Sequence, residues 1–151
     1  MHLIVDCTTT QNQLKYNGVG QYTLNILKRL FKSADFDITL LLFEKESTLD
    51  PYIKNLPENI KVERIGGDKV SNYLNPLWYV TRILPAIKRV RRDDSVYFCP
   101  YFWAGIPSLH IPTVLTVHDF ILPIFNIYSE QSVFHNVIRK IQYWVEMYKA
   151  R

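Results

Sequence analysis

A histidine and an aspartate stand side by side after a short apolar run late in the chain. The run, residues 112–117, is rich in β-branched side chains, and His118 and Asp119 follow it directly. Such a run is typical of a buried parallel strand, and open α/β sheets bind ligands at the carboxyl ends of their strands. An imidazole there can hydrogen-bond a ligand, while a carboxylate can fix the turn behind it. The pair is therefore a candidate for catalysis, and a purely structural pair is the alternative.

Two glycines near the start of the chain are the second candidate for chemistry. Gly18 and Gly20 precede apolar residues at helical spacing, and the strand-like segment 3–6 lies upstream. Glycines at a helix entrance let a ligand approach the backbone, and the free N–H groups of the first turn favour an anion such as a phosphate. We expect these glycines to share one cleft with His118, and a tight loop without a ligand is the alternative.

Three aromatic residues follow a predicted strand near 95–98. Tyr101, Phe102 and Trp103 fall in the loop on the ligand side of that strand, where exposed aromatic rings stack on sugars or grip an acyl chain. Contact with another domain is the equal alternative.

Much of the excess of basic over acidic residues is concentrated in one five-residue window. Lys88, Arg89, Arg91 and Arg92 hold much of the net charge of +4, which is too small an excess to indicate a nucleic-acid partner. The cluster is either a solvated helix end, whose cations complement the helix dipole, or a surface for anionic lipid or an acidic substrate.

Alternating strand and helix patterns predict the elements that must position these side chains. Strands are predicted near 2–6, 37–43, 60–65, 95–98 and 112–117, and helices near 20–32, 76–91 and 129–149. This alternation is typical of an α/β fold with a doubly wound parallel sheet. Right-handed crossovers predict the strand order 3-2-1-4-5, which places Cys7 and Cys99 past the ends of adjacent strands. Pro85 is expected to kink or restart its helix.

Composition narrows the class of protein. A chain of 151 residues with 48% hydrophobic and 21% charged residues can bury one core, so one domain is expected. We found no apolar run of transmembrane length and no signal-peptide pattern, which predicts a cytoplasmic protein. The two cysteines are expected to be reduced, and no residue pattern indicates a metal or a cofactor. The predicted final helix ends with the sequence, so the domain is expected to lack its last strands.

Four segments carry a resemblance to a known family. They are Leu3–Asp6, Gly18–Thr23, Val96–Pro100 and Ile111–Phe120, and their order and spacing extend over essentially the whole chain. On these segments the chain resembles the N-terminal half of the retaining, two-domain glycosyltransferases of the GT-B fold, in the family numbered four. The resemblance implies a single Rossmann-like domain over residues 1–151 that binds the acceptor. It also implies a separate C-terminal domain, not included in these residues, that binds the nucleotide-sugar.

The resemblance implies roles for the candidate residues. Gly18 and Gly20 would approach the diphosphate of the nucleotide-sugar donor, His118 would contact the transferred sugar, and Asp119 would fix the turn behind it. The acceptor would be a glycan or a lipid-linked sugar in the synthesis of a surface polysaccharide. The enzyme would work without a metal and would be peripheral to the inner membrane face.

Three other interpretations stay open. The chain could be a non-catalytic binding or scaffold protein derived from such an enzyme. A dinucleotide-binding protein would use Gly18 and Gly20 as its fingerprint, but Thr23 stands at the third glycine position, and 11 residues separate Asp6 from Gly18 where a tight turn is needed. An unpaired sheet edge would also favour self-association.

Overall fold

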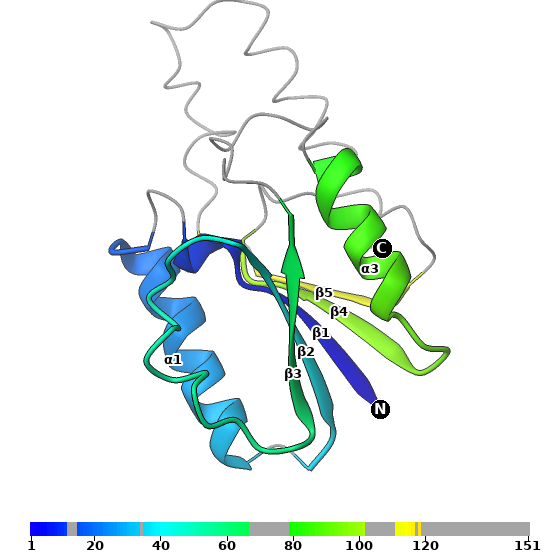
Figure 1. Ribbon diagram of the computed structural model, residues 1–151, viewed down its shortest axis with the longest axis horizontal. Coiled ribbons are helices and arrows are strands. Elements are labelled where there is room, and N and C mark those ends of the chain that lie inside the picture. Colours follow the sequence, from blue (N-terminus) through cyan, green and yellow to red (C-terminus); the bar gives the residue numbers. More distant parts are fainter. Residues whose placement is uncertain (12–14, 34, 67–78, 102–110, 117, 119–151) are drawn as a thin grey trace, which may run out of the picture.

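The computed structural model of the chain describes residues 1–11, 15–33, 35–66, 79–101, 111–116 and 118. In these residues five strands form one all-parallel sheet in the order β3-β2-β1-β4-β5. The strands are β1 (His2–Asp6), β2 (Asp37–Phe43), β3 (Ile60–Ile65), β4 (Ser95–Cys99) and β5 (Thr113–Leu115). The predicted fold class and the predicted strand order are confirmed, and the sheet is Rossmann-like (Figure 1).

The central strands are mostly apolar because both faces of the sheet are covered. In β2, the six residues from Ile38 to Phe43 are all buried. Successive side chains of a strand point to opposite faces, so each central strand contributes to two apolar layers. Helix α1 (Gly18–Ser33) covers one face, and helix α3 (Leu84–Val90) covers the other.

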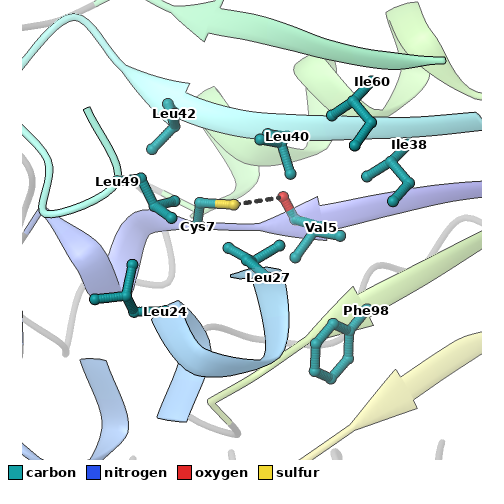
Figure 2. Packing of buried hydrophobic residues seen from close by; sticks show 10 residues of the cluster. All are labelled: Val5, Cys7, Leu24, Leu27, Ile38, Leu40, Leu42, Leu49, Ile60 and Phe98. Atoms are coloured by element: carbon teal, nitrogen blue, oxygen red, sulfur yellow. Dashed lines mark hydrogen bonds between the residues drawn. The ribbon is translucent and has the colours of Figure 1, made fainter. Parts of the chain in front are cut away.

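Among the described residues, the layer against α1 is the larger of the two. Figure 2 shows its buried members. Its buried members are Val5, Cys7, Leu24, Leu27, Ile38, Leu40, Leu42, Leu49, Ile60 and Phe98. The layer against α3 contains Ile4, Leu41, Phe43, Ile65, Ile83, Ala86, Ile87, Tyr97 and Cys99. Cys7 and Cys99 therefore belong to adjacent strand ends, as predicted, but face opposite sides of the sheet. Both cysteines are buried, and neither forms a disulfide.

Pro85 divides the helix that the sequence predicts near 76–91. A π-helical turn, η2 (Tyr79–Ile83), leads directly into α3, and Pro85 lies in the first turn of α3. Proline is tolerated there because the N–H group that it lacks would have no partner within the helix. The helix thus changes from π to α type next to Pro85, and a kink at this residue stays a prediction. Residues 76–78 and the helix predicted near 129–149 lie outside the described residues.

A buried histidine ties three strands together at the amino edge of the sheet. His2 Nδ1 lies 2.8 Å from Ser95 Oγ on β4, and His2 Nε2 lies 2.8 Å from Thr39 Oγ1 on β2. Burial lowers the pKa of His2, and the nearby Arg92 charge lowers this pKa further, while Asp37 and Asp94 act in the opposite direction. The imidazole is therefore held in its neutral form.

The lowered pKa of His2 predicts that the fold is less stable in acid. A lowered pKa in the folded state means that the unfolded chain binds the proton more readily, so the stabilising effect of neutral His2 is complete above the usual value of 6.5. It is lost as the pH falls from 6.5 through the folded pKa. We expect the free energy of unfolding, measured in urea at pH 7 and pH 5, to fall on acidification. His2→Gln should weaken this fall, and an equal fall in the wild-type protein and in His2→Gln would contradict the assignment.

Candidate functional site

The structure brings several predicted residues together at the carboxyl edge of the sheet. His118 lies three residues beyond the end of β5, and its Nε2 lies 2.8 Å from the carbonyl oxygen of Pro100, just beyond β4. A carbonyl oxygen can only accept, so Nε2 donates its proton to Pro100. Within the described part of the chain, Nδ1 of His118 has no hydrogen-bond partner. The exposed imidazole therefore has one nitrogen tied to the backbone and one available to a ligand.

Two tyrosine rings flank this imidazole. The ring of Tyr22, from the second turn of α1, meets His118 edge to face with centroids 4.9 Å apart, and the ring of Tyr101 lies 6.1 Å away. The Tyr22 hydroxyl is also 3.0 Å from Thr116 Oγ1. These contacts place the start of α1 beside the segment that carries His118, so the two signals in the sequence do meet at one edge.

The first turn of α1 presents backbone N–H groups at this edge. The carbonyl of Asn17 accepts the N–H of Gln21 at 2.9 Å, so the N–H groups of residues 18–20 precede the first helical hydrogen bond. Gly18 is exposed, and a Cβ atom added there would meet no described atom within 4 Å. Gly20 is buried. Of the two predicted glycines, Gly18 is thus the one whose backbone is open to a ligand.

A buried carboxylate, which the sequence analysis gave no role, lies at the end of β1. Asp6 Oδ1 accepts the Thr8 N–H at 2.9 Å, and Asp6 Oδ2 accepts the Tyr97 hydroxyl at 3.1 Å. Burial raises the pKa of Asp6, while the hydrogen bonds from Thr8 and Tyr97 act in the opposite direction. The signal in the sequence was a lone acid ending an apolar strand and followed two residues later by threonine, which is the pattern of an Asx turn. Asp6 orders the loop beneath the site and is shielded from solvent.

The polar side chains of Thr8–Gln11, in the first part of the loop after β1, are buried inside the protein. Its short 3-10 helix, η1 (Thr8–Thr10), is joined to α1 by the hydroxyls of Thr9 and Thr23, which lie 2.9 Å apart. Thr23 occupies the position of the third glycine in a dinucleotide-binding fingerprint. In that fingerprint the third glycine allows the helix to pack closely on the strand. Here a hydrogen bond between side chains joins the two segments instead. This arrangement weighs against a dinucleotide site built on Gly18 and Gly20.

Arg89 and Arg92 of the basic cluster are paired with carboxylates of the sheet. Arg89 donates to Glu63 Oε1 on β3 through Nε at 3.1 Å and through Nη2 at 2.8 Å. Arg92 is ion-paired with Asp37 at the start of β2. Lys88 and Arg91 are exposed. The cluster thus fastens the end of α3 to the sheet, and its action on an anionic membrane stays a prediction.

Several predicted residues fall outside the part of the chain that the structure describes. They are Asp119, Phe102 and Trp103, so their positions relative to His118 stay predictions. Among the described residues, no three histidine, cysteine or acidic side chains lie close enough to hold a metal ion. None of the described helices combines the length and the apolar character needed to span a membrane.

Comparisons with known proteins assign no family. No protein-family model matches the chain, and neither a curated protein nor a solved structure is significantly similar to it. The fold and the edge around His118 define a Rossmann-like α/β protein with a ligand-accessible imidazole at its carboxyl edge. The glycosyltransferase resemblance continues to rest on the four sequence segments.

Proposed function

We propose that this chain is the acceptor-binding half of a retaining glycosyltransferase that transfers a sugar from a nucleotide-sugar to a glycan or lipid-linked acceptor. The proposal rests on the exposure and the hydrogen bonding of the His118 side chain. Its imidazole is exposed, Nε2 is tied to Pro100, and Nδ1 is available at the edge where the first turn of α1 also begins. Parallel α/β sheets place their ligands at this edge.

The available groups suit the charges that develop during glycosyl transfer. The transferred sugar becomes cation-like while the diphosphate departs as an anion, so a site needs hydrogen bonds to sugar hydroxyls and donors for the leaving group. Nδ1 of neutral His118 can accept a hydrogen bond from a sugar hydroxyl. The N–H groups at Gly18 can donate to an oxygen of the diphosphate. The ring of Tyr101 offers an apolar surface for a sugar of the acceptor.

The proposal assigns acceptor binding and donor binding to two different domains. In the family that the chain resembles, the residues that hold the donor diphosphate belong to a C-terminal domain. We therefore expect residues 1–151 alone to show no transfer and to bind nucleotide-sugars weakly. Calorimetry that gave micromolar affinity for a nucleotide-sugar would contradict this division. Synthesis of a surface polysaccharide at the inner membrane face is the process that we propose for the whole enzyme.

Ligand titrations followed by NMR test the proposal on this chain. UDP-glucose, GDP-mannose and a short oligosaccharide are added at millimolar concentration while the imidazole resonances are recorded. We expect the resonances of His118, assigned from the spectrum of His118→Ala, to shift, whereas those of His2, buried at the opposite edge, should not. Shifts with NAD⁺ alone would favour a dinucleotide-binding protein. Unchanged His118 resonances with every sugar ligand would contradict the proposal.

A further inference from the structure

We propose that Tyr22 is a positioning residue, which orients the imidazole of His118 from helix α1 so that Nδ1 stays available to a ligand. The orienting contact itself is independent of the proposed function. Only its consequence for sugar transfer rests on that function.

Tyr22 reaches the histidine segment through two contacts of different kinds. Its ring stands at 90° to the imidazole of His118 with centroids 4.9 Å apart, and its hydroxyl lies 3.0 Å from Thr116 Oγ1. Thr116 is itself held by β4, because its N–H donates to the carbonyl of Cys99 at 3.0 Å. One side chain of α1 thus contacts both the histidine and the strand extension that carries it.

The direction of the Tyr22 side chain follows from helix geometry. Side chains of an α-helix lean toward its N-terminus, so a residue in the second turn covers the turn before it. Tyr22 is four residues after Gly18, and its ring therefore leans toward the carboxyl edge of the sheet. A tyrosine one turn further along α1 would not reach His118, which makes this position specific.

The imidazole needs a second restraint that the hydrogen bond does not supply. A single bond from Nε2 to the Pro100 oxygen fixes one nitrogen but permits the ring to rotate about that bond. An edge-to-face contact with Tyr22 fixes the plane of the ring. Together they favour the tautomer that has its proton on Nε2, and they leave the lone pair of Nδ1 for a ligand.

The alternative is that Tyr22 only packs against the apolar layer under α1, of which it is a partly buried member. The two roles differ in one observable, the tautomer of His118, which the ¹⁵N shifts of the imidazole report. We expect the wild-type chain and Tyr22→Phe, which keeps the ring, to show the Nε2–H tautomer. Tyr22→Leu should give a mixture of tautomers. Tyr52→Leu is the matched control, because Tyr52 contacts Lys28 of the same helix, six residues beyond Tyr22.

The outcomes separate the proposal from its alternatives. A folded Tyr22→Leu protein with an unchanged His118 tautomer would overturn the positioning role. If that variant fails to fold, the proposal is tested by nuclear Overhauser contacts between the rings of Tyr22 and His118 in the wild-type chain. The absence of these contacts would overturn the proposal. If the tautomer responds to Tyr22→Leu while no sugar perturbs His118, positioning is supported and glycosyl transfer is not. In an active enzyme, Tyr22→Leu should lower kcat more than it raises KM, and Tyr22→Phe should restore kcat.

Discussion

Replacing His118 with alanine is expected to lower kcat/KM for sugar transfer about 100-fold in an enzyme that combines this chain with a donor-binding domain. A hydrogen bond placed in advance on the transferred sugar is stronger in the transition state than in the ground state, so its loss appears in kcat. The fold should survive, because the imidazole is exposed and, among the described residues, hydrogen-bonds only to the backbone of Pro100.

Steady-state kinetics and thermal unfolding of the same variant provide the test. His2→Gln serves as the control, because it alters a histidine at the amino edge and should change stability without a comparable loss of turnover. Near-normal turnover of His118→Ala would assign His118 to structure and remove the main support for the proposed function.

Removing the carboxylate of Asp6 is expected to have the largest effect on stability among the polar residues of the carboxyl edge. Asp6→Ala leaves the Thr8 N–H and the Tyr97 hydroxyl without their buried acceptor. Each lost acceptor costs about 1–3 kcal/mol, so the free energy of unfolding should fall by about 2 kcal/mol or more. Asp6→Asn retains an oxygen for the Thr8 N–H, and its amide group can donate to the Tyr97 oxygen. The asparagine variant should therefore be much less destabilised than the alanine variant.

The difference between wild type and Asp6→Asn should also depend on pH. Burial raises the folded-state pKa of Asp6 above its usual value of 3.8, so the contribution of this group to stability is complete below 3.8. It declines as the pH rises through the folded pKa, because the folded state then resists loss of the proton. Urea unfolding at pH 4 and pH 7 should show Asp6→Asn gaining stability relative to wild type as the pH rises. A constant difference across that range would contradict an elevated pKa.

Most of the strands were predictable because they are apolar runs between polar segments; β3 (Ile60–Ile65) differs, because half of its residues are charged. The run 37–43 is a clear case, since both of its predicted limits match β2. The order of the strands followed from the handedness of β/α crossovers, which depends little on individual side chains. The prediction of β5 was less good, because the observed strand is the three residues Thr113–Leu115 within the apolar run 112–117.

The contacts that shape the candidate site were not predictable from the same patterns. His118 and Tyr22 are 96 positions apart in the sequence, and periodicity carries no information on which side chain of α1 faces which strand end. Tyr22 belonged to a segment singled out for its glycines, yet no role was assigned to it. The same applies to His2, whose partners Ser95 and Thr39 are defined only by the register of three strands.

Each of the two apolar layers of the protein contains one cysteine thiol, whose reactivity can report on that layer. Cys7 lies in the layer under α1 and Cys99 in the layer under α3, and burial raises the pKa of Cys7 well above its usual value. A thiol of this kind reacts only when its surroundings open. Pulsed alkylation followed by mass spectrometry would therefore time the opening of the two layers separately in the natural sequence. It would show whether the sheet loses α1 and α3 together, as one cooperative unit, or one after the other.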